Sequence, residues 1–214
     1  MRALATIGVL AALALGASSG ARGMTSIASV SHKSSKTHAA RTMTQRATSR
    51  LLASRAFRTR RARPGRARAK GLLSPLELDI VARMNAMRGA RGLRPLRVSR
   101  GLTVAAGYHT RQMGQLGFFE HESANGAPFW RRLERFYPAG RRYWSVGENL
   151  FFESPETTAS SAVHEWMMSP GHRENILGGE FREVGVAAVH YDSAPGTYRS
   201  GPVTIVTADF GVRR

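Results

Sequence analysis

Three side chains in this sequence, two imidazoles and one carboxylate, are of the types that bind metal ions or transfer protons. His121 follows two phenylalanines where a helical pattern ends, Glu148 stands in the segment GENL, and His172 lies in SPGHREN after a helix break. Such groups on separate loops can converge into a zinc site or an acid–base site. They can equally cap helices and join loops by hydrogen bonds, and spacing alone leaves both roles open.

Several other kinds of site are excluded. The absence of cysteine excludes disulfide scaffolds, thiolate zinc fingers, iron–sulfur clusters and cysteine nucleophiles. The sequence has no glycine-rich phosphate loop and no G-x-S-x-G elbow, and Met168 replaces the second histidine that a zincin motif starting at His164 requires. His109 lies on the apolar stripe of a predicted helix, which favours a buried, hydrogen-bonded core histidine.

Caps and hydrophobic spacing predict the elements that position these residues. The capping box at 74–77 starts a helix that ends at Gly89, and Ser99 starts a second helix that Gly117 stops. The expected apolar faces are Leu76, Ile80, Met84 and Met87 in the first helix, and Leu102, Ala105, Ala106, His109, Met113 and Leu116 in the second.

Further along, the residue pattern changes from helical to extended. A turn leads into a short helix within 125–133, and another helix runs from Ser154 to about Met168. The segments 184–191 and 202–211 are typical of strands joined by a Gly/Pro-rich turn, and GENL is interpreted as a turn. Helices followed by strands predict an α+β fold with antiparallel pairing.

Positive charge is concentrated at the N-terminal end. Of the 32 Lys and Arg residues, 15 lie in residues 1–70, which contain no acid, whereas 71–214 hold 17 Arg and 14 acids. The formal net charge of +18 therefore divides into +15 for the first part and +3 for the second, and the step predicts a domain boundary.

The first 70 residues divide into two parts. Residues 1–21, a positive start followed by an apolar run and small residues, have the layout of a signal peptide, with an uncleaved anchor or a transit peptide as alternatives. Residues 22–70 form a basic Arg/Ser/Thr-rich segment predicted to be disordered, because it has little apolar surface to bury. This segment is either a solvated tether or an electrostatic contact with anionic surfaces.

Six segments in one order resemble the CAP superfamily of cysteine-rich secretory proteins, antigen 5 and pathogenesis-related proteins. The resemblance is to its cysteine-free bacterial branch and covers residues 73–212. The segments are MNAMRGARGLRPL (84–96), AAGYHTRQM (105–113), FFEH (118–121), GENL (147–150), WMMSPGHRENIL (166–177) and VGV (184–186).

The resemblance implies, for residues 71–214, a three-layer α-β-α sandwich with a central antiparallel sheet and a surface cleft. Animal and plant members place two His and two Glu in that cleft, where a divalent metal has been associated with them. The first pair matches His121 and Glu148, but Ser169 occupies the second Glu position and the strand of the second His has none. His172 is the candidate to replace that imidazole, so the implied ligands of Zn²⁺ or another divalent metal are His121, Glu148 and His172.

The expected function is binding outside the cell or in the cell envelope, without enzymatic activity. By resemblance, the ligand is a small hydrophobic molecule such as a lipid or sterol, or a cell-wall polymer. No specific nucleic-acid binding is expected, because residues 22–70 lack interleaved aromatic residues, and no transmembrane span is expected in the mature chain. The alternatives are a metal-assisted hydrolase or protease using His121, Glu148 and His172 as catalytic residues, and a structural envelope-assembly protein.

Overall fold

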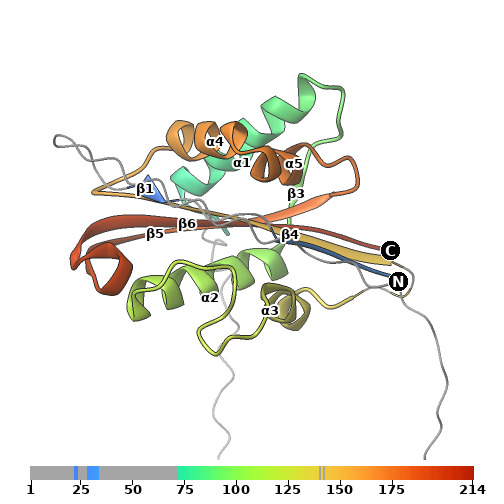
Figure 1. The fold of residues 1–214 in the computed structure, drawn as a ribbon. Coiled ribbons are helices and arrows are strands. Elements are labelled where there is room, and N and C mark those ends of the chain that lie inside the picture. Colours follow the sequence, from blue (N-terminus) through green and yellow to red (C-terminus); the bar gives the residue numbers. More distant parts are fainter. Residues whose placement is uncertain (1–21, 24–27, 34–71, 140, 142) are drawn as a thin grey trace, which may run out of the picture. The chain divides into compact units, whose positions relative to one another are not determined.

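The computed structural model describes residues 22–23, 28–33, 72–139, 141 and 143–214, which all belong to one compact unit (Figure 1). The elements in chain order are β1 (Arg22–Gly23), β2 (Ala28–Lys33), α1 (Pro75–Gly89), β3 (Arg97–Val98), α2 (Arg100–Leu116), α3 (Phe129–Phe136), β4 (Tyr143–Glu153), α4 (Ala159–Met168), α5 (Pro170–Leu177), β5 (Glu183–Ala194), a 3₁₀ turn (Gly196–Tyr198) and β6 (Gly201–Arg213).

One mixed sheet forms the middle layer. Its strand order is β1-β4-β6-β5-β3, with β2 also paired to β4. The three long strands β4, β6 and β5 are antiparallel, as the resemblance implies, and the short β3 adds one parallel pairing to β5. Glu148 lies directly opposite Asp209 in the β4–β6 register, so two acidic residues meet near the centre of the sheet.

Helices cover both faces of the sheet and complete the three-layer α+β sandwich (Figure 1). Helices α1, α4 and α5 cover one face, where Phe151 packs with Ile176 and Trp166. Helices α2 and α3 cover the other, where Val146 packs with Leu102. Because side chains alternate along a strand, Glu148 shares the α2–α3 face with Val146, whereas Asn149 and Phe151 face α5.

The predicted capping box of helix α1 is confirmed, but the face that this helix buries differs from the predicted one. Glu77 N donates to Ser74 Oγ at 3.3 Å and Ser74 N donates to Glu77 Oε2 at 2.6 Å, which forms the expected capping box. Met87, expected in the core, is 38% exposed, and Arg88 is buried in its place. The Arg88 guanidinium donates to four main-chain carbonyl oxygens, those of Arg94, Ile176, Gly178 and Phe181. These bonds offset the cost of burying a charge.

The middle of the chain contains two elements that the sequence pattern did not predict. GENL, interpreted as a turn, lies inside the long strand β4. The break at 169–171 ends α4 as expected, but Pro170 also starts the additional helix α5. The helix expected from Ser154 begins at Ala159, where Thr158 caps it. In α2, Leu116 is 61% exposed, and Gly117 ends the helix with φ of 75° as expected.

Two strands come from the basic segment that was expected to be disordered. β1 and β2 pair antiparallel with the outer edge of β4, with Ala28 opposite Glu148 and Lys33 opposite Tyr143. An edge strand offers unpaired main-chain groups, and pairing with it does not require apolar side chains. The expectation therefore fails for these two strands, while residues 24–27 and 34–70, like the predicted signal peptide at 1–21, lie outside the described residues.

In the described ranges, none of the helices has the length and apolar character needed to cross a bilayer.

Candidate functional site

Five buried ionisable residues of the α2–α3 face come from five separate parts of the chain. His109 lies in α2, His121 in the loop that leads to α3, and Arg132 in α3. Glu148 comes from β4 and Asp209 from β6, as neighbours in the sheet. All five side chains are buried, with at most 8% exposure, and we call them the buried polar cluster.

Glu148 is the anionic centre of this cluster. Its Oε1 lies 2.8 Å from His121 Nδ1, and its Oε2 accepts a hydrogen bond from Arg132 Nη2 at 2.5 Å. Burial opposes ionisation of Glu148, but the charge of Arg132, together with His109 and the hydrogen bond from His121, lowers its pKa below the usual value. Because the carboxylate is ionised, the hydrogen between it and His121 belongs to Nδ1.

Arg132 joins the loop to the sheet. Besides Glu148, its guanidinium donates to the main-chain oxygen of His121 at 3.2 Å and to Ser123 Oγ at 3.0 Å. Planar guanidinium groups suit several simultaneous bonds of this kind. Arg132 therefore fixes the height of the His121 loop above β4.

The two carboxyl groups are driven to different protonation states. Burial, followed by the negative charge of Glu148, raises the pKa of Asp209 well above its usual value, against the opposing effect of Arg132. Two adjacent buried carboxylates would repel each other, so the acid form of Asp209 is favoured while Glu148 stays ionised. The pair therefore holds one negative charge.

His109 is a buried core histidine, as its position on the helix predicted. The side chain is fully buried, and its Nε2 lies 2.8 Å from the main-chain oxygen of Glu120. Burial lowers the pKa of His109 to about 4, with the charge of Glu148 acting in the opposite direction. The imidazole is therefore neutral at pH 7.

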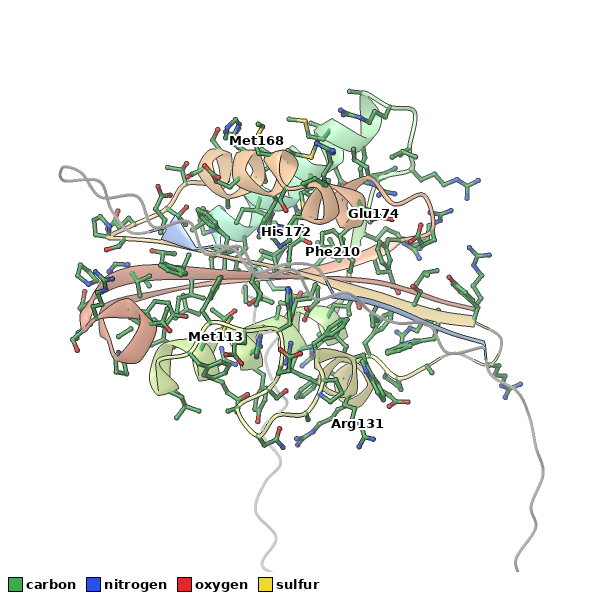
Figure 2. The ribbon with its side chains drawn as sticks, in the orientation of Figure 1. Met113, Arg131, Met168, His172, Glu174 and Phe210 are labelled. Atoms are coloured by element: carbon green, nitrogen blue, oxygen red, sulfur yellow. The ribbon has the colours of Figure 1, made fainter. Side chains whose placement is uncertain are left out.

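His172 does not join His121 and Glu148. It lies in α5, on the opposite face of the sheet, where Figure 2 labels it. Its main-chain oxygen accepts a hydrogen bond from Asn149 Nδ2 at 3.0 Å, and Asn175 Nδ2 donates to Asn149 Oδ1 at 2.8 Å. The proposed three-residue site fails because Glu148 and Asn149 point to opposite faces of β4. The GENL and SPGHREN segments are instead connected by hydrogen bonds.

The residues present do not fit the divalent metal that the resemblance implies. Of the candidate ligands, only His121 and Glu148 lie together, and both oxygens of Glu148 are already hydrogen-bonded. Across the described ranges, no group of three or more His, Cys, Asp or Glu residues is arranged to hold a metal ion. A zinc site requires at least three protein ligands, so no chemical step is assigned to a metal here.

Sequence reasoning missed Arg132 and Asp209, although both had a signal. Arg132 falls on the face of α3 that also carries Phe129, Leu133 and Phe136, so a charged residue occupies an apolar position. Asp209 is the one acid in β6, on the same face as Ile205. A charged residue on a buried face indicates a partner across the core.

A pocket of about 490 Å³ opens beside the buried polar cluster, between α2, α3 and the loop that joins them. We call it the α2–α3 pocket. It is lined by three arginines of α3 and by polar or aromatic residues of α2 and the loop, among them Tyr108, Gln112 and Ser123. Arg132 belongs to both the pocket and the cluster. Figure 2 shows Arg131 on the side of α3 that faces away from the sheet.

The comparison with protein families identifies the fold. Residues 81–210 match the CAP family model, described as the cysteine-rich secretory protein family. The chain belongs to the CAP family. A relative in Bacillus subtilis, the uncharacterized protein YkwD, is 32% identical over 126 residues, which are 58% of this chain and 47% of that protein. The CAP chain thus spans about half the length of this relative.

Solved structures of bacterial surface and extracellular proteins are similar to this CAP chain. An outer surface protein from Borrelia burgdorferi superposes with a TM-score of 0.52 at 17% identity, covering 66% of this chain and 97% of that one, and it shares the fold. An extracellular protein containing an SCP domain from Bacillus anthracis gives a TM-score of 0.49 at 23% identity, covering 66% of this chain and 44% of that one.

Proposed function

We propose that this CAP-domain protein is exported and acts as a binding protein of the cell envelope, without hydrolytic activity. The signal-peptide layout of residues 1–21 supports export, as does the fold shared with a protein described as an outer surface protein. The 14 basic residues and no acids of residues 22–70 add attraction to anionic surfaces, which salt weakens.

The burial of Glu148 is the observation that favours a binding function over hydrolysis. A catalytic carboxylate must reach the substrate or an attacking water. Glu148 is 0% exposed, and both of its oxygens are bonded to cluster residues. With His172 on the other face, the proposed hydrolytic set is not assembled. The α2–α3 pocket, by contrast, offers open space for a ligand.

The pocket linings favour a polar ligand over a lipid or sterol. Arginines line the α2–α3 pocket, and a second pocket of about 490 Å³ is lined by Arg94, Arg182 and Arg214. A lipid tail placed against these arginines would remove water from guanidinium groups without offering them a hydrogen-bond acceptor. A cell-wall polymer is therefore the ligand class we propose.

Cell fractionation and an envelope-binding assay test this proposal. We expect the protein in the medium or envelope, with a mature N-terminus near Ala21, and cosedimentation with purified envelope. Recovery only from the cytoplasm with Met1 intact, or the absence of cosedimentation, contradicts it.

An activity assay tests the hydrolase alternative. We expect no release of fragments from casein or from a cell-wall suspension, with or without added zinc. Calorimetric zinc titration should give equal, weak heats for the wild type, His121→Ala and Glu148→Gln. Hydrolysis that disappears in Glu148→Gln, or tight zinc binding lost in both variants, would favour the enzyme.

A further inference from the structure

The α2–α3 pocket has a strong excess of positive charge. Its charged lining residues are Arg131, Arg132 and Arg135, and none of the described residues that line it is acidic. Arg132 is neutralised by the buried polar cluster, but Arg131 and Arg135 are exposed and have no ion-pair partner within the described residues. The pocket therefore presents two guanidinium groups without an ion pair, while Glu134, the acid between them on α3, lines a neighbouring pocket with both arginines.

Neighbouring aromatic rings hold these two guanidinium groups in place. The Arg131 guanidinium lies 5.4 Å from the centre of the Trp130 ring, and that of Arg135 lies 5.4 Å from the centre of the Phe136 ring. Such cation–π contacts restrict a side chain without neutralising its charge. A pre-oriented guanidinium loses less rotamer entropy when it binds a planar anion, and its fork matches carboxylate and phosphate oxygens.

The α2 side of the pocket supplies aromatic surface and hydrogen-bonding groups. The rings of Tyr108 and Phe136 lie 5.8 Å apart at 46°, and Gln112 Nε2 donates to the Tyr108 hydroxyl at 3.2 Å. Gln112 Oε1 and Arg132 Nε are covered by protein yet have no hydrogen-bond partner in the described part of the chain. A ligand in the pocket therefore meets the Tyr108 hydroxyl and the Gln112 amide nitrogen, whereas these two covered atoms lie behind the lining.

We propose that the α2–α3 pocket binds an anionic saccharide. The acidic group of the sugar binds Arg131 and Arg135, its hydroxyl groups bond to Tyr108 and Gln112, and the C–H face of its ring packs on the aromatic wall. The volume of about 490 Å³ lies within the range of small-molecule sites and holds one or two sugar rings. This assignment rests on the proposed envelope-binding function and specifies its ligand.

Calorimetry on the full mature chain tests the proposal with two pairs of probes. Digalacturonate is compared with its neutral methyl ester, and trehalose 6-phosphate with trehalose, so that the carboxylate and phosphate sources are distinguished. The pocket variant is Arg131→Gln/Arg135→Gln. The control, Arg91→Gln/Arg173→Gln, removes the same charge from exposed positions outside the pocket. The basic segment of residues 22–70 is identical in both variants.

We expect at least one acidic probe to bind at least tenfold more tightly than its neutral partner. The pocket variant should lose at least tenfold in affinity for it, whereas the control variant stays within twofold of the wild type. Equal affinities in the two variants overturn the proposal, because binding would then depend on net charge or the basic segment. The proposal is also overturned if neither acidic sugar binds and the protein instead binds phosphatidylglycerol vesicles in a way that the pocket variant loses. If envelope cosedimentation persists without saccharide binding, the pocket assignment fails and the proposed function stands.

Discussion

Arg132 and Glu148 form an ion pair in which both side chains are buried. The exposed fractions of their side chains are 2% and 0%. Glu148 depends mainly on Arg132 for its charge, because Arg132 has the largest of the effects that lower the pKa of Glu148, ahead of His109 and the hydrogen bond from His121. Removing one member of such a pair leaves an uncompensated charge in the interior, which is more damaging than removing both.

Replacing Arg132 by Met should therefore lower the free energy of unfolding by about 3–5 kcal/mol. The double variant Arg132→Met/Glu148→Gln should recover part of this loss, because no charge is then left buried. Urea unfolding followed by circular dichroism measures both. The matched control Arg131→Met, at an exposed position in the same helix, should change the value by less than about 0.5 kcal/mol. Equal losses at the two arginines would show that the ion pair contributes nothing.

His109 makes stability depend on pH in a defined window. Its folded pKa is about 4, below the unfolded value of about 6.5, so the unfolded chain binds the extra proton between these limits. The contribution of neutral His109 to the free energy of unfolding is therefore fully present above pH 6.5. It is lost as the pH falls towards 4, by up to about 3 kcal/mol. The lowered pKa of Glu148 affects stability only below about pH 4.5. The raised pKa of Asp209 has the opposite effect, because the contribution of Asp209 to the free energy of unfolding decreases as the pH rises.

The variant His109→Gln isolates this effect, since its amide can still donate to the Glu120 carbonyl. Unfolding free energies measured from pH 7 to 4.5 should fall less steeply in the variant than in the wild type. Because Asp209 is present in both proteins, its contribution cancels in the difference. Parallel pH profiles would mean that the His109 imidazole becomes protonated inside the fold at no cost.

At the residue scale, the sequence predicted two members of the buried polar cluster as site residues and a third, His109, as a core histidine. His121 and Glu148 were matched by family motifs, and they are in contact. His172 was included because it is the imidazole of the SPGH motif and could replace the histidine missing from the family strand. It does not join the site, because the face to which a strand residue points follows from the strand register, and the interpretation of GENL as a turn gave no register. Arg132 was missed although the helical spacing of Phe129, Leu133 and Phe136 places it on the apolar face of α3.

Among the elements, those with local signals were predicted and those defined by tertiary contacts were not. The capping box of α1 and the glycine stop of α2 involve residues within one turn of each other. Strand β4 contains Gly-Glu-Asn, which has low strand propensity and is kept extended by pairing with β6. Gly147 illustrates this dependence, since a Cβ there would lie 2.5 Å from Asn175 Oδ1 on α5. The need for that glycine is visible only in the assembled layers.

Gly185 sets the separation between α2 and the sheet. A Cβ at this position of β5 would overlap the main chain of Leu102 and Thr103, where α2 begins. We expect Gly185→Ala to lower the free energy of unfolding by about 3 kcal/mol, because overpacking of this kind displaces backbone. Gly89→Ala, at the end of α1 with no atom within 4 Å of the added methyl, is the control and should be neutral within about 1 kcal/mol. Chemical denaturation distinguishes them, and equal stability of the two variants would contradict the close approach.

At the scale of the whole molecule, the N-terminal strands protect the outer edge of the sheet. β1 and β2 pair with β4 along most of its length. Composition could not predict this, because the segment carries the charge and polarity of a disordered tether. Hydrogen exchange should show slow exchange for the β4 amides that point away from β6 in the full chain, and fast exchange in a chain starting at Leu72. β5, which does not contact these strands, is the internal control. Unchanged protection of β4 would show that β1 and β2 are not paired in solution.

The order of strands in the sheet has a consequence for the timing of folding. β6 lies between β4 and β5, although it follows both of them along the chain. Until residues 201–213 have left the ribosome, β4 and β5 have no partner between them, and the two helical layers have no continuous surface to pack on. The three-layer arrangement can close only when β6, the last of these three strands along the chain, lies between β4 and β5.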